Sequence, residues 1–243
     1  IYEVNQNKYL NFKSASKLKV KNPKIFGVMP DWNPAEIIGF KPDNLSLSLY
    51  QKLITKKNWA KQRYEFGYRK IYNSKLIESF CGTPYVSVNK SIESFLPRNL
   101  PNIISNKILK ISLKKLYENP SKHDKLEFEI LPNCLDYNFF KWKNFYLKKN
   151  LTKFEINLLK KNLKEIKKND QNIYEHYSKK LNYFEKFQIS KSKNNITKIY
   201  SLINLCVNNL TLMFAHFARC GFVSVIIMNS ALRNKKITKR KYD

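Results

Sequence analysis

Residues Lys24–Gly39 read KIFGVMPDWNPAEIIG, the densest run of unusual residues in a chain rich in Lys, Asn, Ile and Leu. Asn33 is a favourable N-cap and Pro34 suits the first position of a helix. Gly39 suits the position that follows a helix end. Three elements are therefore predicted in turn: an extended segment (Lys24–Val28), a tight loop (Met29–Trp32) and a short helix (Pro34–Ile38).

The side chains around this loop also suggest a functional site. Asp31, Trp32 and Asn33 would lie at the helix N-terminus, and Glu36 occupies the third helical position, where an acid completes a capping box. Capping alone requires neither a Trp nor Met-Pro-Asp before it. Two interpretations stay open: a well-capped helix start with a packed Trp, and a site element.

The chain is strongly basic. Its 243 residues carry a formal net charge of +28, from 46 Lys and Arg against 18 Asp and Glu. Such an excess raises nucleic acid or an anionic membrane as a partner. Lys, however, accompanies Asn and Ile throughout the chain, as in a general compositional drift. A nucleic-acid surface would instead concentrate Arg with Gly and aromatic residues, so nucleic-acid binding is kept only as an alternative.

Composition and patterning also indicate the cellular compartment. Hydrophobic residues make up 43% of the chain, which is enough for a substantial core. The four cysteines are far apart and form neither a metal motif nor a disulfide framework, and no apolar signal segment follows the N-terminus. We therefore predict a cytoplasmic protein. The most apolar stretch, Leu210–Met228, contains His216 and Arg219, which we interpret as packing residues of a buried helix, with no membrane span.

The remaining pattern predicts a mainly helical α+β protein. The clearest helix start is at Leu151, where Thr152 is the N-cap, Glu155 the capping-box acid and Ile156 the staple partner. Short strands are predicted at Lys24–Val28, Tyr85–Val88 and Lys125–Ile130. Helices are predicted at Leu45–Trp59, at Ile104–Tyr117, from Leu151 to Ile166, at Ile173–Phe187 after an interruption at Asn169–Gln171, and at Ile199–Leu232, with a break near Gly221 left open.

Three parts of the chain are predicted from these patterns. Residues 1–23 are polar and form a linker or tail. Residues 24–131 form an α+β part that carries the opening stretch, and residues 132–243 form a mainly helical part. The last two parts form one continuous domain in an alternative interpretation.

A second informative stretch is Ser121–Ile130, which reads SKHDKLEFEI. Its apolar and charged residues alternate, which predicts a strand with Glu127 and Glu129 on one face, about 7 Å apart. His123 and Asp124 precede them. The stretch is either a solvated face with Lys–Glu pairing or an edge that handles a metal or phosphate.

A third stretch, Trp59–Tyr72, is aromatic and basic. Arg63 is interpreted either as a core residue with cation–π packing or, together with Arg69, as a phosphate ligand. The common catalytic motifs GxxxxGK[ST], GxGxxG, HExxH and GxSxG are absent from the sequence. No self-contained active site can be assembled from the sequence.

Seven peculiar stretches occur in a fixed order: Ile25–Gly39, Leu45–Thr55 (LSLSLYQKLIT), Trp59–Arg69 (WAKQRYEFGYR), Gly82–Val88 (GTPYVSV), Ser94–Pro97 (SFLP), His123–Ile130 (HDKLEFEI) and Phe214–Val225 (FAHFARCGFVSV). Together they resemble the central region of phosphoenolpyruvate synthase-like, PEP-utilising proteins. The resemblance covers roughly Lys24 to Asp243. One departure follows Gly82, where a usual Y-I-D-V-R is replaced by YVSVN, so no role is assigned to that Asp and Arg.

The resemblance implies flanking ATP-grasp and phosphohistidine domains in the same polypeptide, so we expect this chain to be a fragment of a larger multidomain protein. The implied chemistry is phosphoryl transfer from ATP, with Mg²⁺, through the histidine to pyruvate or a related small molecule. None of His123, His176 and His216 lies in a context resembling the phosphohistidine motif. The segment alone is therefore expected to be inactive.

Candidate site residues come from the most unusual stretches, because phosphoryl transfer needs cations and metal-holding carboxylates around the moving group. Substrate or phosphate contacts are predicted for Asp31, Trp32, Asn33, Glu36, Arg63, Arg69, His123, Asp124 and Lys125, and metal ligation for Glu127 and Glu129. Two alternatives remain: a non-catalytic basic scaffold that binds nucleic acid, and a spacer that docks mobile domains.

Overall fold

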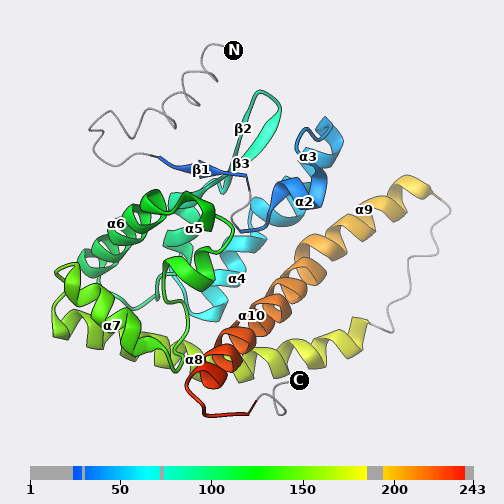
Figure 1. The fold of residues 1–243 in the computed structure, drawn as a ribbon. Helices are drawn as coiled ribbons and strands as arrows, with labels where there is room; N and C mark the ends of the chain where they lie inside the picture. The colour runs from blue at the N-terminus through cyan, green and yellow to red at the C-terminus, as the bar shows by residue number, and fades with distance from the viewer. Residues whose placement is uncertain (1–23, 29–30, 72–73, 185–193, 239–243) are drawn as a thin grey trace.

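The computed structural model describes residues 24–28, 31–71, 74–184 and 194–238. Within them the chain is mainly helical, with one small sheet (Figure 1). The predicted mainly helical α+β class is confirmed. The tail or linker predicted at residues 1–23 lies outside the described residues.

The sheet is antiparallel, in the order β1-β3-β2, and consists of β1 (Phe26–Gly27), β2 (Ile77–Phe80) and β3 (Thr83–Ser87). The strands predicted at Lys24–Val28 and Tyr85–Val88 are thus present with shifted limits, whereas β2 was not predicted. Cys81 and Gly82 join β2 to β3 with φ angles of 51° and 79°. Two successive positive φ angles are typical of a two-residue type I′ hairpin turn.

Helices and helical turns form the rest of the described chain. Six of them make up the first half: α2 (Pro34–Ile38), α3 (Asn44–Tyr50), the π-helical turn η1 (Gln51–Thr55), α4 (Asn58–Phe66), α5 (Val88–Ser94) and α6 (Asn102–Glu118). The second half contains the 3₁₀ turn η2 (Pro120–Lys122), the π-helical turn η3 (Leu126–Ile130), α7 (Phe139–Lys148), α8 (Lys153–Phe184), α9 (Asn195–Leu205), the π-helical turn η4 (Cys206–Leu210) and α10 (Thr211–Arg233).

Two predicted helix starts are confirmed in atomic detail. The Asn33 side chain accepts hydrogen bonds from the backbone N–H groups of Ala35 at 3.0 Å and Glu36 at 3.3 Å, and so caps α2. At α8, the Thr152 N–H donates to Glu155 Oε2 at 2.8 Å, and Thr152 Oγ1 accepts from the Glu155 N–H at 3.1 Å. This reciprocal pair is a capping box.

The strand predicted at Lys125–Ile130 is wrong. Leu126 and Ile130 are buried at the two ends of η3, and Phe128 between them is 40% exposed. Residues four apart share a face of a helical turn, so the same alternating sequence also satisfies this geometry. The Lys115 ammonium donates to the Glu129 carbonyl oxygen, which holds the turn against α6.

Three predicted helix limits also differ from the structure. The helix predicted at Leu45–Trp59 is divided into α3 and η1, and α4 begins at Asn58. No break occurs at Asn169–Gln171, because the buried Ile166 and Ile173 continue the apolar face of α8 across the polar residues. Helix α10 is also continuous through Gly221.

Most buried apolar side chains form one core between α4, α5, α6, α7, α8 and α10. Ile108 and Val223, which lie on either side of the predicted boundary at residue 131, both belong to it. A smaller cluster around Trp59 and Val86 joins the sheet to α3 and α4. The two predicted parts therefore share a core, and the boundary itself stays a prediction.

Helices α9 and α10 continue through η4 as one helical stretch of 39 residues, Asn195–Arg233 (Figure 1). Among the described residues, this one helix is long and apolar enough to cross a membrane by length and composition alone, a test that core helices also pass. Helix α10 packs against α4 and α8. These contacts are compatible with the prediction that no membrane span is present, but the helix predicted to be buried is buried only in part, since Phe214, Phe222 and Val225 are exposed.

Candidate functional site

The loop at Asp31–Asn33 turns its carboxylate into the protein interior. Asp31 and Trp32 have φ angles of 44° and 48°, a conformation that costs free energy for residues other than Gly. Asp31 Oδ1 lies 2.7 Å from Arg63 Nη2, and the Ser91 hydroxyl donates to Asp31 Oδ2 at 3.1 Å. The Tyr50 hydroxyl donates to the Trp32 carbonyl oxygen. Side chains from three elements, α3, α4 and α5, thus hold the strained loop in place.

Helix α4 supplies Arg63 and ends so that Tyr68 enters the same region. Gly67 ends α4 at a φ of 118°, and a Cβ at this position would lie 3.0 Å from Cγ1 of Ile166 on α8. Both the backbone and the close approach of the two helices therefore require glycine. The next residue, Tyr68, is fully buried, and its hydroxyl donates to the Asn133 carbonyl oxygen at 2.7 Å.

Helix α10 adds a second buried arginine. Arg219 Nη1 lies 2.6 Å from Glu127 Oε2, and Nη2 donates to the Tyr68 hydroxyl oxygen at 2.8 Å. The guanidinium carbons of Arg63 and Arg219 lie 3.9 and 5.1 Å from the centroid of the Phe95 ring, so both arginines contact one aromatic side chain. We name the following group the paired-arginine cluster: Asp31, Arg63, Phe95, Glu127 and Arg219.

The cluster balances two guanidinium charges with two carboxylates. The side chains of Asp31 and Arg63 are each 7% exposed, that of Glu127 is 18% exposed and that of Arg219 is 0% exposed. Burial raises the pKa of Glu127, while Arg219 and Arg63 act to lower it. Burial lowers the pKa of Arg219, but Tyr68 and Glu127 together raise it above the ordinary value. Removing one partner would leave a buried charge unpaired, so the cluster acts as a coupled unit.

Each arginine of the cluster also keeps one N–H group outside these pairings. In the part of the chain that the structure describes, Arg63 Nε and Arg219 Nε are buried and have no hydrogen-bond partner. Guanidinium groups bind carboxylate and phosphate oxygens through such N–H groups. The surrounding side chains bury both arginines. The direct role that the cluster supports is therefore to hold in position the segments that carry its residues.

A second hydrogen-bonded group joins α4, α8 and α10. Glu65 Oε2 accepts from the Tyr177 hydroxyl at 2.8 Å and lies 3.0 Å from His216 Nε2. The His216 ring stacks on Tyr177 at a centroid distance of 4.3 Å and on Phe66 at 6.3 Å. Burial lowers the pKa of His216, and Glu65 opposes this effect only in part. The lowered pKa favours the neutral His216 ring near pH 7. The burial of His216 agrees with the packing role predicted from the sequence.

Of the predicted site residues, Asp31, Arg63 and Glu127 are brought together in the cluster. The others contact other parts of the molecule or face solvent. Trp32 lies 6.2 Å from the Phe214 ring, Asn33 caps α2, Arg69 donates to Asn102 Oδ1 at 2.6 Å, His123 Nδ1 lies 3.0 Å from the Pro120 carbonyl oxygen, and Glu36, Asp124 and Lys125 are exposed.

The geometry expected for the predicted metal ligands is wrong. The π-helical turn directs Glu127 to Arg219 and Glu129 to Lys122, each at 2.6 Å, so the two carboxylates do not share a face. Across the described ranges, no group of three or more His, Cys, Asp and Glu side chains could hold a metal ion. Glu127 and Glu129 therefore do not fit a shared Mg²⁺ site.

Arg219, Tyr68, Ser91 and Phe95 belong to the site, but the sequence analysis did not predict them as site residues. Arg219 gave the strongest signal, because a charged residue in the middle of an apolar helix needs a buried partner. Arg219 was predicted to be a packing residue, and its partner Glu127 is 92 residues away in the chain. No local pattern could identify that partner.

A cavity of about 570 Å³ lies between α6, η3, α7 and α10. Lys115, Trp142, Phe145 and Arg233 are among its lining residues, and none of the five cluster residues lines it. The Lys115 ammonium nitrogen lies 4.1 Å from the centroid of the Trp142 ring and donates to the Glu129 carbonyl oxygen. The polar groups of this cavity are thus separate from those of the cluster.

Comparison of the chain with family models, curated proteins and solved structures returns no match. The features that bear on function are the stretches of sequence quoted above and the geometry of the cluster. That geometry combines a strained loop, two balanced ion pairs and an aromatic ring in the interior of the protein.

Proposed function

We propose that this chain is the central segment of a phosphoenolpyruvate synthase-like phosphotransferase, which supports ATP-dependent phosphoryl transfer to pyruvate or a related acceptor. The observation that carries the proposal is where the residues of the paired-arginine cluster lie in the sequence. Its five residues come from five of the seven stretches that resemble the family, although these stretches are widely separated in the chain. We also propose a cytoplasmic location, which the four free cysteines support.

In this proposal the cluster contributes by position. The Arg63 ion pair and the Ser91 hydrogen bond hold the Asp31–Asn33 loop in its strained conformation. Backbone strain is concentrated at functional sites, where the surrounding structure maintains it. The loop then presents the partly exposed Trp32 to the region where the flanking domains act.

The reacting groups themselves belong mainly to other domains in this proposal. ATP and Mg²⁺ would be bound by an ATP-grasp domain, and the phosphoryl group would be carried by a histidine of a swivelling domain in the same polypeptide. Mg²⁺ supplies charge neutralisation at the transferring phosphate when it is bound. The residues of this chain fix the loop against which the mobile domains close.

The test is the rate of phosphoryl transfer from γ-labelled ATP, measured in the full polypeptide that contains this segment. Asp31→Asn and Asp124→Asn each remove one carboxylate charge, but Asp31 is buried and Asp124 is exposed. We expect the rate to fall by about tenfold or more in Asp31→Asn, because small displacements of positioning groups are costly. Asp124→Asn should keep the parental rate.

A Trp32→Ala variant separates function from stability. Its backbone carbonyl can still accept the Tyr50 hydrogen bond, and the side chain removed is only partly buried. We expect a folded protein with a reduced transfer rate. Parental rates in both Asp31→Asn and Trp32→Ala, or no phosphoryl transfer by the parental polypeptide, would contradict the proposal.

A further inference from the structure

The stretch from α9 to α10 has an exposed surface without charged side chains. We name the following six apolar residues, each between 37% and 63% exposed, the uncharged face: Ile199, Tyr200, Phe214, Phe222, Val225 and Met228. The other exposed positions between Ile199 and Leu232 are also uncharged. At a rise of about 1.5 Å per residue, the face extends for about 44 Å from Ile199 to Met228.

This surface is not the ordinary outside of a core helix. In α10, exposed Phe214 and Val225 lie opposite the buried Arg219 and Val223, which anchor the helix to the protein. In α9 and η4 no residue is buried, although most of their side chains are apolar. Exposed apolar surface of this size on a helix marks a surface that binds a partner.

Compositional drift does not explain the uncharged face. A drift that places Lys wherever it is tolerated accounts for α8, whose exposed positions include Lys160, Lys161, Lys164 and Lys168. Between Ile199 and Leu232, by contrast, the one charged residue is Arg219, and it is buried. The uncharged face therefore lacks charged side chains, whereas the other long helix, α8, carries many of them.

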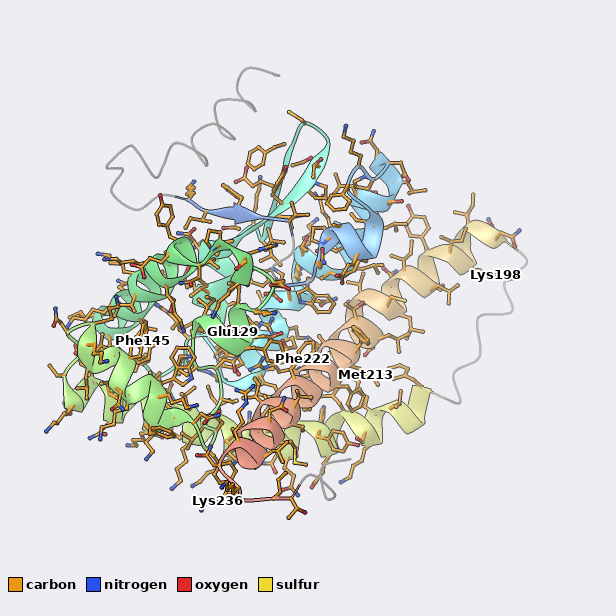
Figure 2. All side chains as sticks on the ribbon, viewed as in Figure 1. Glu129, Phe145, Lys198, Met213, Phe222 and Lys236 are labelled. Atoms are coloured by element: carbon orange, nitrogen blue, oxygen red, sulfur yellow. The ribbon has the colours of Figure 1, made fainter. Side chains whose placement is uncertain are left out.

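The charges at the two ends of the helical stretch indicate what kind of partner binds the uncharged face. Lys198 precedes the uncharged face, and Arg233, Lys235 and Lys236 follow it, with no Asp or Glu between Asn195 and Lys236. Figure 2 shows Lys198 and Lys236 at opposite ends of the stretch, with Phe222 between them. If two copies paired through this face, basic ends would meet in either direction and repel each other. An anionic partner, by contrast, attracts both ends.

We propose that the uncharged face docks on an anionic lipid surface. The helix lies in the plane of the membrane, its apolar side chains enter the boundary between headgroups and acyl chains, and its basic ends contact the headgroups. The net charge of +28 adds attraction to such a surface. This is attachment to one leaflet and not a membrane span, and it is independent of the proposed phosphoryl transfer.

The test is flotation of the whole chain with lipid vesicles. We expect the chain to float with phosphatidylcholine vesicles that contain about one third phosphatidylserine, and to bind pure phosphatidylcholine vesicles more weakly. The double variant Ile199→Asn/Val225→Asn should bind the anionic vesicles at least about tenfold more weakly, because two apolar side chains no longer transfer into the membrane. Higher salt should weaken binding of the parental chain.

The control variant is Ile103→Asn/Phe154→Asn, which changes two side chains that are 73% and 74% exposed on α6 and α8. It should bind like the parental chain. Equal weakening in both double variants, equal binding to neutral and anionic vesicles, or no flotation would overturn the proposal. So would a dimer in sedimentation that only Ile199→Asn/Val225→Asn dissociates, because a second copy would then cover the face.

Discussion

The π-helical turn η3 carries two carboxylates in different surroundings. One lies in the interior between α4 and α10, and the other lies at the outer edge of η3. Glu127 pairs with Arg219 inside, and Glu129 pairs with Lys122 outside, and both distances are 2.6 Å. The partners differ in exposure: Arg219 is 0% exposed, whereas Lys122 and Glu129 are 37% and 40% exposed. Equal distances therefore do not mean equal contributions, because water solvates the outer pair whether or not it forms.

Glu65 lies between these two extremes. Its side chain is 33% exposed, and its partners are the buried His216 and the Tyr177 hydroxyl. The three glutamates thus form a series in which the partner and the access to water change together. Variants along this series test whether burial, and not contact distance, decides the contribution of each group.

The largest effect is expected for Glu127→Ala. This change leaves the Arg219 guanidinium buried without its carboxylate, so the free energy of unfolding should fall by about 3–5 kcal/mol. Urea unfolding measures the loss. The double variant Glu127→Met/Arg219→Met removes both charges and should recover part of the stability, and a loss below about 1 kcal/mol in Glu127→Ala would contradict the distinction between inside and outside.

A smaller effect is expected for Tyr177→Phe. The change removes the hydroxyl that donates to Glu65 at 2.8 Å but keeps the ring that stacks on His216. A hydrogen bond to a charged group contributes about 1.5–3 kcal/mol, and the partly exposed Glu65 carboxylate should bring the loss toward the lower value. The matched control is Tyr174→Phe, since Tyr174 is 53% exposed. Equal losses in the two variants would contradict the proposed role of Glu65.

The same group predicts a pH dependence of stability. Burial lowers the pKa of His216 in the folded state below its ordinary value of 6.5, so the unfolded chain takes up the proton more readily. The stability is fully present above pH 6.5 and falls as the pH drops below it, by at most about 1.4 kcal/mol per pH unit for one proton. The folded-state pKa of Glu65 is lowered by its partners, so its own loss begins only at more acidic pH.

Urea unfolding at several pH values between neutral and about pH 5 measures this dependence. His216→Phe keeps an aromatic ring between Phe66 and Tyr177 and removes the titrating group. The variant should be less stable at neutral pH, because Glu65 loses a hydrogen bond, and its stability should change less with pH in this range. An unchanged slope would show that another group takes up the proton.

The local part of this architecture could be predicted from the sequence. Asn33 and Thr152 were identified as helix caps because a cap depends on the few residues that follow it. The unusual residues around Asp31 and Arg63 also pointed to a site. The left-handed backbone at Asp31 and Trp32 could not be predicted, because contacts with Tyr50, Arg63 and Ser91 maintain it from distant parts of the chain.

The failed predictions share a physical cause. In Lys125–Ile130, a strand and a helical turn both place Leu126 and Ile130 on one face and differ in the burial of Phe128, so the sequence pattern could not separate them. Tertiary contacts decided the outcome: Arg219 binds Glu127, and Lys115 binds the Glu129 carbonyl oxygen. Strand β2 was missed because its turn, Cys81–Gly82, lacks the Asn-Gly signature of such hairpins. In both cases the deciding partner or geometry was absent from the local sequence.

The smallest effect is expected for Glu129→Ala. The change removes the pair with Lys122 but leaves the backbone contact from Lys115, so the free energy of unfolding should fall by about 0–1 kcal/mol. Because both charges contact water, the loss should shrink further at high salt, whereas the loss in Glu127→Ala should persist. Urea unfolding of both variants at low and high salt measures the contrast. A salt-resistant loss of several kcal/mol in Glu129→Ala would mean that the turn itself depends on the outer pair, and burial would no longer explain why the two glutamates differ.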